Sequence, residues 1–176
     1  MIFTETRLKG AFVVELERRD DERGFFARSW CRTEFEAHNL NPAIVQCNVS
    51  FNRLKGTLRG MHYQAAPFEE AKLVRCTSGA LYDVIIDLRP TSATYQQHVS
   101  ELLSAANRKM LYVPEGFAHG FQTLEDNTEV FYQMSQFYSP EHARGVRYND
   151  PAFGIEWLIA EPVITQRDRD YPDFNG

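Results

Sequence analysis

The sequence has few cysteines and no long apolar run. Its three cysteines are odd in number and widely spaced, which fits neither a disulfide framework nor a zinc site. Nowhere do about 18 apolar residues follow one another, so the sequence predicts no membrane-spanning helix. Charges interrupt residues 1–20 every few positions, which excludes a signal peptide there. We therefore expect a reduced, cytoplasmic protein.

The sequence also has no excess of basic residues. Lysine and arginine number 19 against 24 aspartates and glutamates, which gives a net charge of -5. Neutralising nucleic-acid phosphates or an anionic membrane requires a basic face, so we predict neither as a partner. An anionic ligand must instead meet a local cluster of arginine and lysine.

No repeat, low-complexity tract or linker divides the 176 residues, and 43% of them are hydrophobic. This length and composition are typical of one globular domain, which we place at residues 1–176.

Short apolar runs separated by turn residues predict an all-β fold with few helices. Such regularly spaced strands favour an antiparallel sandwich or barrel over a doubly wound sheet. The best helix signal is residues 32–39, with Thr33 as its N-cap. A turn is predicted at residues 20–24 and an extended run at 25–30. The predicted strands are residues 11–16, 43–47, 57–64, 72–78, 80–88, 96–103, 110–113, 120–124 and 128–136.

The strand at residues 58–64, Leu-Arg-Gly-Met-His-Tyr-Gln, carries the densest chemistry of the chain. Alternate side chains of a strand share a face, so His62 and Gln64 are expected to point into one space. Gly60 leaves room there for a ligand or for a closely approaching backbone. A histidine in a sheet is more often structural than catalytic, so its interpretation depends on its partners.

The run Pro114-Glu-Gly-Phe-Ala-His119 is a turn that often precedes a strand in cupins, where its histidine commonly binds a metal. Here Gln64 stands where a metal-binding cupin usually has a second imidazole. The carboxylates of Glu69 or Glu70 would be distant ligands, so the sequence offers few ligands for a first-row metal ion. We predict no metal, and a metal-dependent cupin oxygenase is retained as an alternative.

Without a metal, the polar residues are suited to removing a proton next to a carbonyl group. A neutral histidine accepts the proton, a carboxylate fixes its tautomer, and a lysine stabilises the enolate. A phenol on the opposite face returns a proton, which inverts the carbon. Tyr132 is by type more often a packed aromatic, and Lys72 and Asp168 more often surface charges. The expected cavity residues are Arg59, His62, Gln64, Lys72, Asp83, His119 and Tyr132.

Asp83 lies within an apolar strand, where a carboxylate requires a partner. His119 and Arg75 are the two candidates.

The ordered motifs resemble the dTDP-4-dehydrorhamnose 3,5-epimerases, cupins that epimerise nucleotide-linked 4-keto-6-deoxy sugars. The resemblance implies a cupin-type jelly roll, or double-stranded β-helix, without a cofactor. It also implies a homodimer whose N-terminal segment contributes to the partner, and a sugar-nucleotide substrate. The motifs that carry it are residues 21–26, 58–64, 72–75, 83–89, 114–121, 138–140, 149–151 and 167–169.

The resemblance assigns a role to each candidate residue. It makes His62 the base, polarised by Asp168, and Tyr132 the acid on the opposite face. Lys72 then holds the 4-keto oxygen. His119, Asp83 and Gln64 are supporting residues. The expected substrate contacts are Arg59, Gln46, Asn48, Phe137 on the base, and Arg23 and Phe26 reaching the nucleotide of the other subunit.

Two positions depart from the family pattern. Arg28, also placed among the substrate contacts, stands where the family commonly has a glutamate that accepts a hydrogen bond from thymine. Cys47 and Val49 replace an aspartate and a histidine of the family. The sequence therefore leaves dTDP, CDP and GDP open as carriers. It also leaves open a single-carbon epimerase at C3 or C5, and a non-catalytic cupin that binds a sugar nucleotide.

Overall fold

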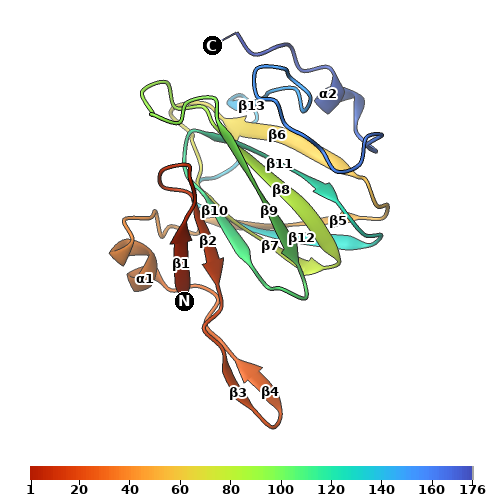
Figure 1. Ribbon diagram of the computed structural model, residues 1–176. Coiled ribbons are helices and arrows are strands. Elements are labelled where there is room, and N and C mark those ends of the chain that lie inside the picture. The colour runs from red at the N-terminus through yellow and green to blue at the C-terminus, as the bar shows by residue number, and fades with distance from the viewer. Residues whose placement is uncertain (176) are drawn as a thin grey trace.

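The computed structural model describes residues 1–175 and contains two antiparallel β-sheets that face each other (Figure 1). The six-stranded sheet has the order β1 (Ile2–Glu5), β2 (Phe12–Glu15), β10 (Met110–Val113), β7 (Lys72–Ser78), β12 (Thr128–Met134) and β5 (Gln46–Asn52). The five-stranded sheet has the order β13 (Ala143–Gly145), β6 (Leu58–Gln64), β11 (Phe117–Thr123), β8 (Ala80–Asp87) and β9 (His98–Ser104). The all-β prediction is confirmed.

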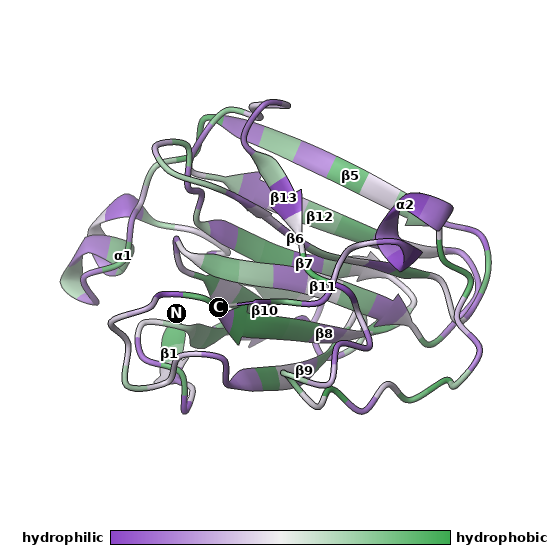
Figure 2. Cartoon of the chain, turned by 90° about the horizontal axis from the view of Figure 1, so that it is seen from above, coloured by the Kyte–Doolittle hydropathy of each residue, from purple (hydrophilic) through white to green (hydrophobic). Residues whose placement is uncertain are grey.

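A hydrophobic core fills the space between the sheets because alternate residues of each strand point inward. Figure 2 shows β8 and β10 as almost wholly hydrophobic, whereas β5 at the sheet edge alternates. Burying each large apolar side chain contributes about 1.5–3 kcal/mol to folding. The core includes Val74, Cys76, Leu81, Ile85, Leu103, Leu111, Phe117, Phe121 and Val130.

A small hairpin extends away from the two sheets (Figure 1). It consists of β3 (Arg19–Asp21) and β4 (Gly24–Phe26), which pair with each other only. The predicted turn at residues 20–24 lies at its tip. The predicted extended run to residue 30 is too long, since β4 ends at Phe26.

Helix α1 (Arg32–Ala37) confirms the predicted helix but not its predicted start. Thr33 lies inside the helix, and the preceding Cys31 makes no side-chain capping bond. Phe35 is instead buried, and its ring packs edge-on against Phe3 and Tyr112. Packing therefore stabilises this short helix without a side-chain cap.

Several predicted boundaries are wrong. β5 covers Gln46–Asn52 and not 43–47, and β11 begins at Phe117 and not at 120. Strands β1 and β13 and helix α2 (Gln166–Arg169) were not predicted. Helix α2 carries Asp168 and contacts β6. Within residues 1–175, no helix is long and apolar enough to cross a membrane.

Gly60 permits β6 and β11 to approach closely. Its φ is +132°, and a β-carbon there would lie 2.6 Å from the Gly120 Cα. Of the two possibilities for Gly60, a close backbone and not a ligand occupies the space. This packing fixes the register in which His62 lies directly opposite His119.

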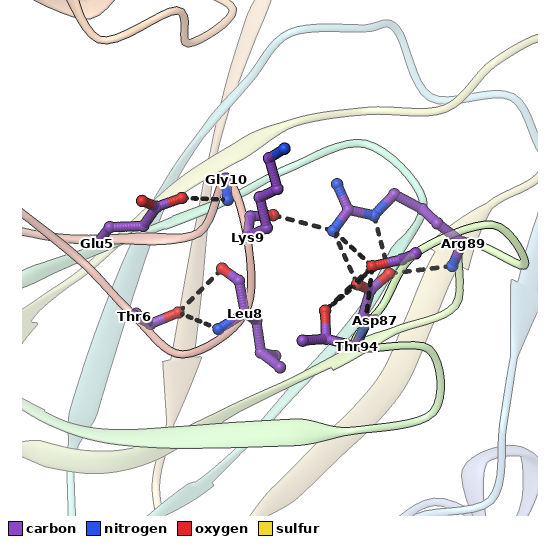
Figure 3. A network of polar contacts seen from close by, with 9 residues as sticks. Glu5, Thr6, Leu8, Lys9, Gly10, Asp87, Arg89 and Thr94 are labelled. Carbon is purple, nitrogen blue, oxygen red and sulfur yellow. Dashed lines mark hydrogen bonds and ion pairs between the residues drawn. The ribbon is translucent and has the colours of Figure 1, made fainter.

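A polar network joins the β1–β2 turn to the end of β8 (Figure 3). Arg89 donates from Nε to Asp87 Oδ1 at 2.8 Å and from Nη2 to the Lys9 carbonyl at 2.9 Å. Thr94 donates to the second carboxylate oxygen of Asp87 at 2.7 Å. Asp87 is fully buried, so these donors replace the water that its carboxylate lost.

Candidate active site

A cavity of about 440 Å³ opens between the two sheets. It is lined by five strands, β5, β6, β7, β11 and β12, so both sheets contribute. Six of the predicted site residues line it: Asn48, Arg59, His62, Lys72, His119 and Tyr132.

His62 forms the central pair of this site with Asp168. Its Nε2 lies 2.8 Å from Asp168 Oδ1, and the Gly60 N–H donates to Oδ2 at 3.3 Å. Asp168 is buried on α2, where Thr165 caps the helix by accepting a hydrogen bond from the Asp168 N–H. Burial alone would raise the pKa of Asp168, but the hydrogen bond and charge of His62 and the Gly60 N–H hold it below its usual value. Asp168 therefore stays ionised beside His62.

A buried carboxylate holds His119 as Asp168 holds His62. The His119 Nε2 lies 2.7 Å from Asp83 Oδ1, and Asp83 is fully buried. His119 is thus the partner of Asp83, while the Arg75 guanidinium lies over the Phe131 ring. Asp83 was expected to line the cavity, but it lies behind His119 and does not.

Two cations line the cavity. The Lys72 Nζ lies 3.1 Å from Glu70 Oε1, and both side chains are buried. The Arg59 Nε donates to Asn52 Oδ1 at 2.8 Å. The chain as a whole is acidic, but these two cations give the cavity a local positive charge. An anionic ligand requires such a charge.

Tyr132 projects from the sheet opposite to that of His62. Its ring centroid lies 6.0 Å from that of His119, and it packs against the core. Burial, with the nearby Asp83 carboxylate, raises the pKa of Tyr132 well above its usual value. The phenol therefore keeps its proton at neutral pH and can donate it.

Gln64 was expected in the cavity lining, and this expectation is wrong. Its amide donates to the carbonyls of Phe68 and Phe137 and accepts from the Ser139 N–H at 2.6 Å. Gln64 shares with His62 a smaller cavity of about 140 Å³, where Arg167 and Tyr138 also lie. Its contacts tie the loop after β12 to β6.

Two more predicted substrate contacts, Gln46 and Phe137, do not line the main cavity. Gln46 accepts a hydrogen bond from the Tyr138 N–H at 3.0 Å. Phe137 has 61% of its surface exposed, so its ring is free to stack on a planar ligand.

The remaining predicted contacts lie on or after the projecting hairpin and do not reach this cavity. Arg23 is exposed and pairs with Asp21 at 2.6 Å, and Phe26 is 73% exposed. Arg28 pairs with Glu34 at 2.8 Å, and Glu34 also binds the N-terminal amine.

Five lining residues were not predicted from the sequence: Val49, Ser50, Phe51, Phe121 and Met134. The alternation of polar and apolar residues from Gln46 to Asn52 is the signal that places Asn48 and Ser50 on one face of β5. The predicted strand ends at residue 47 and therefore leaves Ser50 out.

The residues present do not form an obvious metal site. Within residues 1–175, no group of three or more histidine, cysteine, aspartate or glutamate side chains is arranged to hold a metal ion. The Nε2 atoms of His62 and His119 each contact a carboxylate, of Asp168 and Asp83 respectively.

Comparison with known proteins identifies the family. Residues 5–176 match the family described as dTDP-4-dehydrorhamnose 3,5-epimerase. The chain belongs to this family. The dTDP-4-dehydrorhamnose 3,5-epimerase of Sinorhizobium fredii is 39% identical over 175 residues, which cover 99% of this chain and 90% of the relative.

Solved structures give the same result. The dTDP-4-dehydrorhamnose 3,5-epimerase of Bacillus anthracis, with TDP and PPi bound, has a TM-score of 0.94 at 39% identity and covers 98% of this chain and 99% of its own. A 3′-monoepimerase from Streptomyces bikiniensis in complex with dTDP-quinovose has a TM-score of 0.87 at 29% identity, over 96% and 85% of the two chains. The predicted family, the cupin-type jelly roll and the isomerase class are confirmed.

Proposed function

We propose that this epimerase acts on a dTDP-linked 4-keto-6-deoxy hexose and inverts both C3 and C5. One observation carries the assignment: His62 from one sheet, paired with Asp168 of α2, and a protonated Tyr132 from the other sheet line the same cavity. A sugar ring held between the sheets would then meet a base on one face and an acid on the other.

The first step is removal of a proton next to the 4-keto group. His62 takes the proton, and the ionised Asp168 at its Nε2 stabilises the imidazolium that forms. The C–H electron pair moves to the keto oxygen and gives an enolate. Lys72 lies in the same cavity and can stabilise the oxygen that gains the negative charge.

The second step returns a proton from the opposite side. Tyr132 donates its phenolic proton to the carbanion carbon, and the keto group is restored with that carbon inverted. The raised pKa of Tyr132 keeps the phenol protonated until this step. The chain's own residues thus supply a base, an acid and an oxyanion partner, and the proposed reaction uses no cofactor.

The decisive experiment is proton NMR in deuterium oxide with 4-keto-6-deoxyglucose linked to dTDP, CDP or GDP. We expect the C3 and C5 proton signals of the dTDP sugar to disappear in the presence of the wild-type protein. His62→Asn should abolish this exchange, whereas His38→Asn, an exposed histidine stacked on Phe3, should retain it. No exchange with any carrier would overturn the proposal in favour of a binding cupin.

The same experiment separates the proposal from its main alternative. Loss of only one signal would identify a single-carbon epimerase, a reaction that the Streptomyces bikiniensis relative makes plausible. Preference for CDP or GDP would assign the carrier differently, as the replacement of the family glutamate by Arg28 suggests.

We further propose a cytoplasmic homodimer in which the hairpin of one subunit completes the site of the other. The exposed Arg23 and Phe26, away from the cavity of their own chain, support this arrangement.

A further inference from the structure

The Lys72 ammonium has a buried carboxylate neighbour, Glu70, that the mechanism above does not use. Both side chains are 8% exposed, and their charged atoms lie 3.1 Å apart. Residues two apart in an extended chain share a face, so this contact follows directly from the local backbone. A buried charge without a partner is costly, so each of these two buried groups stabilises the other.

The backbone between the two residues is fixed. The Ala71 N–H donates to Ser135 Oγ at 2.7 Å, and the Ser135 N–H donates to the Ala71 carbonyl at 3.0 Å. Ala71 itself is buried. The Glu70 carboxylate is therefore held in place on the side of Lys72 and cannot easily swing into solvent.

The Lys72 ammonium has one ion-pair partner among the residues that the structure describes. Glu70 is the acidic group within ion-pair distance of Lys72, and Arg59 is the other cation that lines the cavity. The other titratable groups that line the cavity are His62 on β6, His119 on β11 and Tyr132 on β12.

We propose that Glu70 is a positioning residue that holds the Lys72 ammonium in place, directed at the keto oxygen. This inference rests on the proposed function, since it assigns Lys72 to the developing enolate. Glu70 does not touch the substrate; it acts through the lysine.

Glu70→Gln tests the charge because it preserves the size of the side chain. Removing an oxyanion partner itself costs about 10²–10³ in rate, so we expect a smaller loss, about tenfold in kcat near neutral pH. KM should change little, because Glu70 acts on the position of the lysine and not on substrate binding. Glu70→Asp, which keeps the charge, should restore part of the rate, and Glu69→Gln should behave as wild type.

A double variant distinguishes positioning from a merely structural role. If Glu70 acts through Lys72, adding Glu70→Gln to Lys72→Met should leave kcat unchanged. A further tenfold loss in the double variant would overturn the proposal.

The role of Glu70 and the proposed function can fail separately. A wild-type kcat in Glu70→Gln would overturn the role of Glu70, whereas absent exchange of substrate protons by the wild-type protein would instead overturn the proposed function.

Discussion

At the scale of single residues, the proposed base, His62, depends on a contact across 106 positions of the sequence. Asp168 holds the His62 imidazole at Nε2, and its own ionised state follows from the hydrogen bonds that it accepts. We predict that Asp168→Asn lowers kcat about 10²–10³-fold with little change in KM, because acid–base catalysis of this kind contributes 10²–10⁴. Steady-state kinetics on the dTDP sugar provide the measurement.

The matched control for this variant is Asp170→Asn on the same segment. Among the described residues, the Asp170 carboxylate accepts hydrogen bonds from Gln166 alone, so Asp170→Asn should leave kcat within about twofold of wild type. Equal losses in the two variants would mean that the segment was disturbed and would contradict the role of Asp168.

The proposed acid, Tyr132, leads to a different prediction. Tyr132→Phe removes the proton donor but leaves His62 and its carboxylate intact, so the enolate should still form. We expect the C–H signals of the substrate to be lost in deuterium oxide while the epimer appears at least about 10²-fold more slowly. Tyr82→Phe is the control, since Tyr82 packs on Trp157 away from the cavity. Loss of exchange along with inversion in Tyr132→Phe would assign the tyrosine another role.

At the scale of elements, the sequence predicts strands well where they are apolar and poorly where they serve the site. β10 is a continuous apolar run and β8 is apolar apart from Tyr82, Asp83 and Asp87, and both were predicted. In β5, polar residues such as Asn48 and Ser50 alternate with apolar ones, and only residues 46 and 47 of this strand were predicted. Helix α2 has only four residues, too few for a periodic pattern, and its position follows from the contact of Asp168 with His62. The resemblance to a family supplied what the local pattern could not.

The turn network at the end of β8 makes stability depend on pH. Burial alone would raise the pKa of Asp87, but hydrogen bonds from Arg89, Ser92 and Thr94 lower it from 3.8 to about 2. A carboxylate whose pKa is lowered on folding stabilises the protein above its unfolded pKa, and this contribution is lost as the pH falls toward the folded pKa. The window is therefore about pH 4 to 2.

We predict that Asp87→Asn lowers the free energy of unfolding by about 2 kcal/mol at pH 7. The difference from wild type should shrink as the pH falls through this window, because the wild-type carboxylate then takes up a proton. Urea denaturation at a series of pH values measures it, with the exposed Asp20→Asn as control. A difference that stays constant down to pH 2 would contradict the assignment.

At the scale of the whole molecule, a single chain leaves its predicted nucleotide contacts far from its own cavity. The hairpin projects from the body with Arg23 and Phe26 exposed (Figure 1), and the cavity is lined without them. The pattern of strands along the sequence carries no information about pairing between chains, so the predicted homodimer comes from the family resemblance alone. We expect a mass of about 41 kDa in solution by light scattering, twice the 20.4 kDa of one chain.

If the hairpin of one subunit completes the cavity of the other, mixing two defective variants should restore part of the activity. We expect Arg23→Ala to weaken substrate binding and His62→Asn to abolish turnover when each is assayed alone. In a mixed dimer, the subunit with intact His62 receives an intact hairpin from its partner, so one of the two sites is complete. Random pairing makes half of the dimers mixed, and co-refolded equal amounts should therefore show about a quarter of the wild-type activity. Activity no higher than the average of the separate variants would mean that each hairpin serves its own chain.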